Sequence, residues 1–209
     1  SGEIDLTARK NTYPVNVGGV QIGGSDQVVV QSMTDTDTAD IVNTVNQVKL
    51  LSDAGSELVR VTVNNVAAAK AVFEISKRLA DLGCTVPLVG DFHFIGHRLL
   101  RDYPNLASTL SKFRINPGNV GRGSRHDENF AAFIEIAKDL GKPVRIGVNA
   151  GSLDPDVMAA KMDENSRLRE PLSSEKVENQ ALVDSALAST EAALDIGLNP
   201  NQIIISCKV

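Results

Sequence analysis

Two short apolar runs with a helix-length segment between them decide the fold: Phe113-Arg114-Ile115-Asn116 and Val144-Arg145-Ile146-Gly147-Val148-Asn149, separated by Glu128–Leu140. Apolar runs of this length, rich in Val and Ile, are typical of buried strands. The segment between them has helical spacing and is followed by Gly141, a residue that commonly ends helices. A strand, a helix and a second strand in this order predict a parallel pair covered by a helix.

The same alternation extends in both directions along the chain, which gives six predicted strands in all. The other strands are expected at Val28–Met33, Leu58–Val63, Pro87–His93 and Ile203–Val209. Further helices are expected from a cap near Thr36–Thr38 to Ala54, at Ala67–Leu82, and at Gln180–Ile196, with a shorter helical piece interrupted at Tyr103-Pro104. Residues 154–178 are charged and without clear periodicity, so we expect a mobile loop over the strand ends there.

This alternation fits either an open doubly wound sheet or a closed barrel. The first strand is followed by Ser32-Met33-Thr34-Asp35 and carries no GxGxxG fingerprint, which favours the barrel. Residues 15–24 alternate around Gly18-Gly19 like a hairpin that could cap the closed bottom. A closed barrel of this type needs eight strands. A natural end after six strands would leave two unpaired parallel edges, so we expect a fragment. The expected fold is one α/β domain over residues 1–209: a (β/α)8 TIM-type barrel, truncated after about six strands, with an N-terminal β-hairpin.

Composition excludes several classes of function. The formal net charge is −5, with no basic tract and no Trp, so nucleic-acid binding is not expected. No apolar run approaches the ~20 residues that a membrane helix needs. Cys84 and Cys207 are far apart and match no metal-ligand spacing, so we expect free thiols and a cytoplasmic location.

In the second to sixth predicted strands, the polar residues fall on one face of each strand. Side chains alternate faces along a strand, so residues two apart share a face. One face must be apolar to pack on the helices, and the polar face then points to the barrel axis near the carboxyl ends of the strands, where such barrels carry their active sites. The candidate site residues are Arg60, Asp91, His93, Arg114, Asn116, Arg145, Asn149 and Lys208.

Anion binding is the chemistry that this set favours, because three arginines and a lysine converge with only Asp91 to neutralise them. So many cations suit a diphosphate better than a single carboxylate. The alternative is a set of interior ion pairs that merely fills the barrel.

Weaker signals leave further alternatives open. The glycine-rich stretch 118–123 could approach a phosphate through its amides or could serve as a flexible connection. His93 and His97 are four residues apart, but His93 ends a strand, so we expect no metal site. Lys208 could instead form a Schiff base in an aldolase-type barrel.

Five segments resemble the family of 4-hydroxy-3-methylbut-2-en-1-yl diphosphate synthase, and the resemblance runs from about residue 10 to residue 209. They are Val30-Gln31-Ser32-Met33-Thr34, Leu58-Val59-Arg60-Val61, Gly90-Asp91-Phe92-His93-Phe94, Arg114-Ile115-Asn116-Pro117-Gly118-Asn119 and Arg145-Ile146-Gly147-Val148-Asn149-Ala150-Gly151-Ser152. This family opens the ring of 2-C-methyl-D-erythritol 2,4-cyclodiphosphate reductively on the methylerythritol phosphate route to isoprenoids.

The resemblance implies that Arg60, His93, Arg114, Asn116, Arg145, Asn149 and Lys208 bind the diphosphate and ring oxygens, with Asp91 beside them. It also implies a homodimeric oxidoreductase that receives electrons from flavodoxin or ferredoxin. Its [4Fe-4S] cluster is held by three cysteines and a glutamate of a separate C-terminal domain. Cys84 and Cys207 match none of these ligands, so this stretch of chain is expected to be the substrate-binding portion, inactive alone. A fragment that only self-associates through its sheet edges is a further alternative.

Overall fold

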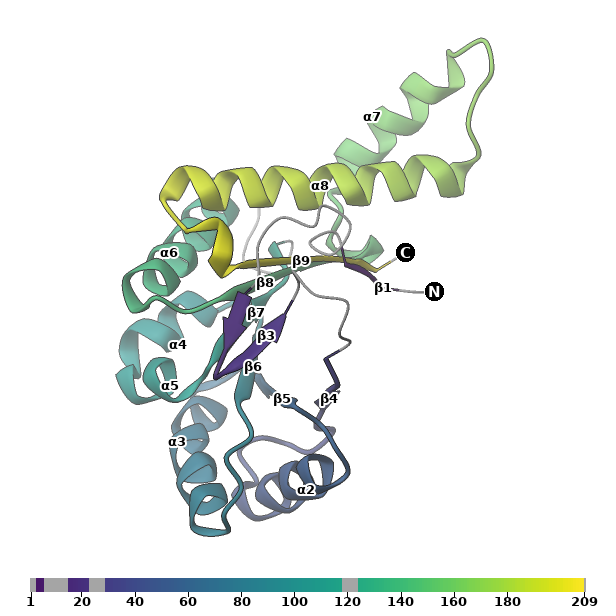
Figure 1. Cartoon of the computed structure of the whole chain (residues 1–209). Helices are drawn as coiled ribbons and strands as arrows, with labels where there is room; N and C mark the ends of the chain where they lie inside the picture. The colour runs from purple at the N-terminus through teal and green to yellow at the C-terminus, as the bar shows by residue number, and fades with distance from the viewer. Residues whose placement is uncertain (1–2, 6–14, 23–28, 118–123, 209) are drawn as a thin grey trace.

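The computed structural model describes residues 3–5, 15–22, 29–117 and 124–208. Six parallel strands curl into a half-barrel, with the helices packed on its outer side (Figure 1). These strands lie side by side in the order in which the chain meets them: β4 (Gln31–Met33), β5 (Leu58–Val63), β6 (Leu88–Phe92), β7 (Lys112–Ile115), β8 (Val144–Val148) and β9 (Ile203–Lys208). The predicted α/β class with a barrel of about six strands is therefore confirmed.

Helices connect the successive strands, as the sequence pattern predicts. They are α2 (Ile41–Asp53), α3 (Val66–Asp81), α4 (Gly96–Asp102), α5 (Pro104–Thr109), α6 (Ser124–Leu140), α7 (Pro155–Ser166) and α8 (Ser174–Ile196), with short 3-10 turns at η2 (Ala150–Ser152) and η3 (Pro200–Gln202). The Tyr103-Pro104 interruption separates α4 from α5 as expected. α2 begins later than predicted, because the Asp40 side chain accepts the Asn43 amide and caps the helix there.

The outward residues of the strands form one apolar core with the helices. Val59, Val61, Phe92, Ile115 and Ile146 are all fully buried in it. The rings of Phe92 and Phe113 and the ring of Phe133 on α6 make edge-on contacts, with centroids 5.5–5.9 Å apart. The apolar residues of each strand, two positions apart, thus face the helices. The residues that alternate with them face the inside of the curve, and we call each of these two alternating sets a strand parity.

The predicted N-terminal hairpin is present as β2 (Val15–Val17) and β3 (Val20–Ile22). Gly18 and Gly19 both have positive φ, as a tight two-residue hairpin turn requires. Val15 and Val17 are fully buried on a second apolar cluster made by Leu58, Val89 and Ile204, which are inward residues near the starts of their strands. The hairpin therefore covers the inner side of the half-barrel at the amino ends of its strands.

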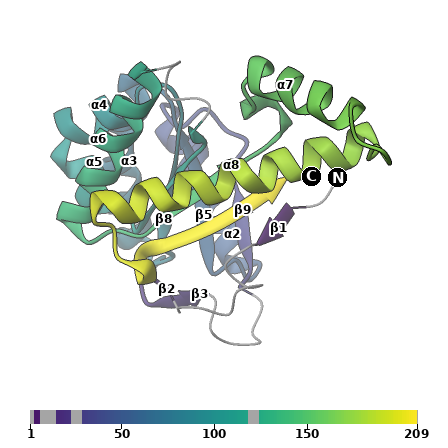
Figure 2. The ribbon, with the colours of Figure 1, turned by 90° about the horizontal axis from the view of Figure 1, so that it is seen from above.

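The prediction of a loop over residues 154–178 is wrong. Asp154 caps α7, which has Pro155 in its first turn, and Ser173 caps α8, which then continues for 23 residues. α7 lies beside the first half of α8, where Lys161 Nζ is 3.2 Å from Asp184 Oδ2 (Figure 2). The pattern was missed because α7 contributes no buried residue and so has little apolar periodicity.

One edge of the six parallel strands is covered by a strand that the sequence did not predict. Strand β1 (Glu3–Asp5) pairs antiparallel with β9, with Glu3 opposite Lys208 and Asp5 opposite Ser206. β4 forms the opposite edge of the seven-stranded sheet. Across the described ranges, every helix is too short or too polar to cross a membrane.

The ring cluster gives a first test of this fold. Phe133→Ala should lower the free energy of unfolding by about 3–5 kcal/mol, since it empties a fully buried site between β6, β7 and α6. Urea unfolding followed by circular dichroism measures the change. Phe73→Ala is the matched control, because Phe73 is 48% exposed on α3. An equal effect of the two substitutions would contradict the assigned core.

Candidate functional site

Asp91 is the centre of the polar cluster on the inner face. Its carboxylate is buried, and Arg114 Nη1 on the next strand donates a hydrogen bond of 2.8 Å to Oδ1. Oδ2 lies 3.9 Å from Arg60 Nε and 3.9 Å from His93 Nε2. Strand register brings these side chains together. Asp91 pairs with Arg114 on β7 and with Thr62 on β5, and Arg60 lies two residues before Thr62, on the same face of β5. Two arginines and a histidine thus share one carboxylate.

Arg145 extends the cluster to β8. It is directly opposite Arg114 in the sheet register, and its Nε donates to Ser206 Oγ on β9 at 3.1 Å. Burial lowers the pKa of Arg145 below its usual value. Burial also lowers the pKa of Arg60, with a further lowering from Arg114 that Asp91 partly opposes. These guanidinium groups have lost water, so a bound anion would recover favourable interactions.

Gly147 gives the Arg114 guanidinium room to lie against β8. A Cβ atom at this position would be 3.1 Å from Arg114 Nη2 and 3.4 Å from Ser206 Oγ. Any larger residue would displace one of these two side chains. The glycine inside the Arg-Ile-Gly-Val-Asn run therefore has a packing role within the site.

Two donors in this cluster are left without acceptors. The Nε atoms of Arg60 and Arg114 are buried and make no hydrogen bond within the part of the chain that the structure describes. Arg60 Nε and Asp91 Oδ2 are 3.9 Å apart, which is close enough for an ion pair but too far for a hydrogen bond. Buried unsatisfied donors are costly, and a site that binds an anion is one reason for them.

The net charge of the cluster is positive, which also favours an anion. Among four of its side chains, Arg60, Arg114 and Arg145 carry three positive charges and Asp91 carries one negative charge, a formal excess of two positive charges. Lys112 and Lys208 add two further cations to β4–β9, and Asp91 is the one carboxylate on these strands. Below the arginines lies Lys112, which is fully buried and donates from Nζ to Gln31 Oε1 at 3.2 Å across the half-barrel. Lys112 was missed as a candidate, although it has the same strand parity as Arg114 and that signal could have found it.

The other predicted residues lie at the carboxyl ends of the same strands. His93, Asn116 and Asn149 directly follow β6, β7 and β8, and Asn116 is buried. Lys208 ends β9 and is exposed. A Schiff-base lysine needs shelter from water, so this exposure gives the aldolase alternative no support. The glycine-rich stretch 118–123 is outside the described residues.

The described residues do not fit an iron–sulfur cluster. Both cysteines are buried in the helix-facing core, where Cys207 Sγ lies 3.7 Å from the Leu182 carbonyl oxygen. Among the described side chains, no group of three or more His, Cys, Asp or Glu could hold a metal ion. His97 is buried on α4. Its burial lowers its pKa, and the positive charges of Arg101 and Arg98 lower that pKa further.

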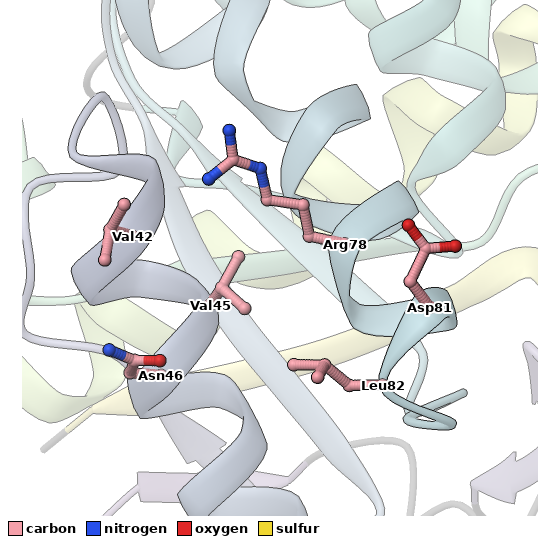
Figure 3. A pocket seen from close by; sticks show the side chains of 6 residues that line it. All are labelled: Val42, Val45, Asn46, Arg78, Asp81 and Leu82. Carbon is pink, nitrogen blue, oxygen red and sulfur yellow. The ribbon is translucent and has the colours of Figure 1, made fainter.

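A separate groove of about 310 Å³ lies on the outer helix layer. It is bounded by Val42, Val45 and Asn46 on α2 and by Arg78, Asp81 and Leu82 at the end of α3 (Figure 3). None of the strand-end residues lines it. The groove is therefore unrelated to the cluster around Asp91.

The central role of Asp91 can be tested by Asp91→Asn. The substitution should lower the free energy of unfolding by about 2–4 kcal/mol, because it leaves two largely buried arginines without their carboxylate. Asp53→Asn is the control, since its ion pair with Lys49 is exposed and should contribute about 0.5 kcal/mol or less. Chemical denaturation of both variants measures the difference, and similar losses would refute the assignment.

Solved barrels with other functions have a similar fold. A Burkholderia cenocepacia dihydropteroate synthase complexed with 7,8-dihydropteroate matches with a TM-score of 0.61 at 16% identity, over 92% of this chain and 62% of that one. A Coxiella burnetii dihydropteroate synthase in complex with pteroic acid matches with a TM-score of 0.55 at 12% identity, over 98% and 65% of the two chains. A truncated 3-deoxy-D-arabino-heptulosonate 7-phosphate synthase from Thermotoga maritima gives 0.54 at 15% identity, over 97% and 59%.

These likenesses show the fold alone, and the chain spans about 60–65% of the length of these solved relatives. A match to a sequence family is more specific. The model of the GcpE TIM-barrel domain matches residues 12–209, which is nearly the whole chain. This match confirms the family resemblance carried by the arginine-containing strands. The chain belongs to the GcpE family of isoprenoid-pathway enzymes, as its TIM-barrel portion.

Proposed function

We propose that the cluster around Asp91 binds the diphosphate of 2-C-methyl-D-erythritol 2,4-cyclodiphosphate. The whole protein then opens this ring reductively to 4-hydroxy-3-methylbut-2-en-1-yl diphosphate. The observation that carries the proposal is the pair of buried Nε donors of Arg60 and Arg114, which lack acceptors in the described part of the chain. Membership of the GcpE family, which implies an iron–sulfur oxidoreductase, supports the choice of substrate.

A diphosphate suits these groups in both charge and shape. Guanidinium groups donate pairs of parallel hydrogen bonds that match phosphate oxygens, and such charge-assisted bonds are among the strongest in proteins. The formal excess of two positive charges calls for a ligand with more than one negative charge. Asp91 keeps Arg114 in place by a direct hydrogen bond while leaving its Nε available.

The arginines would also stabilise the reaction electrostatically. When the bond between the ring carbon and the phosphate oxygen breaks, negative charge accumulates on that oxygen, and fixed guanidinium groups nearby lower the energy of that state. His93, Asn116, Asn149 and Lys208, at the carboxyl ends of their strands, would contact the remaining ring and phosphate oxygens. The two electrons need a group that the described residues do not hold.

For the whole protein we propose the arrangement that family membership supports. It would contain a [4Fe-4S] cluster bound outside the described residues, form a homodimer in the cytoplasm, and accept electrons from flavodoxin or ferredoxin. This chain would be the part that binds the substrate.

Calorimetric titration with the cyclic diphosphate tests the proposed site. Arg145→Ala should weaken binding roughly tenfold or more, because it removes at least one charge-assisted contact from a partly dry site. Arg145→Lys should recover only part of the affinity, since a lysine keeps the charge but cannot donate the two parallel hydrogen bonds of a guanidinium group.

The control is Arg78→Ala, which removes an arginine from the outer face of α3, where it pairs with Glu74. Its affinity should match that of the unaltered chain. Equal affinity of the Arg145→Ala and Arg78→Ala variants would refute the proposed diphosphate site around Asp91.

A further inference from the structure

Arg60 makes a second contact that the proposed function does not use. Its Nη2 donates to Met33 Sδ at 2.9 Å, and the two residues are direct neighbours in the register of β4 and β5. Met33 is 53% exposed, although its partner Arg60 is largely buried. A thioether is a weak acceptor, so this contact restrains the guanidinium only lightly.

Met33 is also the most exposed of the sulfur-containing residues. The sequence contains three methionines and two cysteines. Both cysteines are buried, and burial raises the pKa of Cys207, which keeps it in the unreactive thiol form. Met158 and Met162 are half-buried on α7. Exposure governs the rate of methionine oxidation, so Met33 should react first with a peroxide.

We propose that Met33 is a site of reversible oxidation that controls how available Arg60 is to an anion. A hydroperoxide transfers one oxygen atom to Sδ: its O–O bond breaks, an S–O bond forms, the sulfur loses two electrons, and hydrogen peroxide leaves as water. The product is a methionine sulfoxide, which methionine sulfoxide reductases convert back. Its effect on ligand binding rests on the function proposed above.

Oxidation changes the partner of Arg60 from a weak acceptor to a strong one. The sulfoxide oxygen is polar and carries a partial negative charge, and it would be bound to Sδ, which lies 2.9 Å from Nη2. The guanidinium group would then be held towards β4 and would lose a donor for the ligand. Arg114 donates to Asp91 and Arg145 donates to Ser206, so oxidation of Met33 acts directly on one arginine of the three.

The first experiment follows the modification without any ligand. The chain is treated with limiting hydrogen peroxide, and peptide mass spectrometry compares the three methionines. Met33 should be oxidised before Met158 and Met162. The side-chain ¹⁵N NMR signal of Arg60, assigned by its loss in Arg60→Lys, should shift on oxidation and should not shift when Met33→Leu is treated in the same way.

The second experiment measures affinity for inorganic pyrophosphate by calorimetry. Oxidation should weaken binding roughly tenfold, sulfoxide reductase should restore it, and peroxide should leave the affinity of Met33→Leu unchanged. The inference is overturned if Met33 reacts no faster than the α7 methionines, or if the Arg60 signal stays unshifted when Met33 is oxidised. If the untreated chain fails to bind pyrophosphate, the proposed function fails instead, and the first experiment still decides the role of Met33.

Discussion

The whole inner face depends on one buried carboxylate. Asp91 is the only acid on β4–β9, and the guanidinium of Arg114 is hydrogen-bonded to it while Arg60 and His93 lie at ion-pair distance. Without it, like charges on adjacent strands would repel one another in surroundings of low dielectric. With it, the positive charges are held close together but not fully neutralised. The repulsion between the arginines is therefore reduced, and the positive charge that remains suits the proposed binding of an anion.

Strand parity explains why the sequence predicts so much of this site. Because residues two apart share a face, the alternation alone places Arg60, Asp91 and Arg114 together and assigns the apolar parity to the helix-facing core. The individual contacts could not be predicted in this way. The bonds from Lys112 to Gln31 and from Arg60 to Met33 join residues 81 and 27 positions apart and depend on side-chain direction across the curve of the sheet. α7 was missed because it buries nothing.

The comparison with other barrels separates scaffold from site. Dihydropteroate synthases and a heptulosonate-phosphate synthase share this arrangement of strands and helices at 12–16% identity, so the scaffold by itself does not specify a reaction. The specific information lies in a few inward residues. Gly147 makes space for Arg114, Ser206 accepts from Arg145, and the hairpin buries Val15 and Val17 on the apolar floor beneath them. These contacts hold the arginines in place without a ligand, which would lower the cost of the proposed binding.

A crystal structure of the chain with 2-C-methyl-D-erythritol 2,4-cyclodiphosphate tests the central claim most directly. The account predicts phosphate oxygens within hydrogen-bond distance of the Nε atoms of Arg60 and Arg114, with Arg145 also in contact and the Asp91–Arg114 bond retained. A ligand bound in the outer groove between α2 and α3, or one at the strand ends that leaves both Nε atoms without an acceptor, would contradict it.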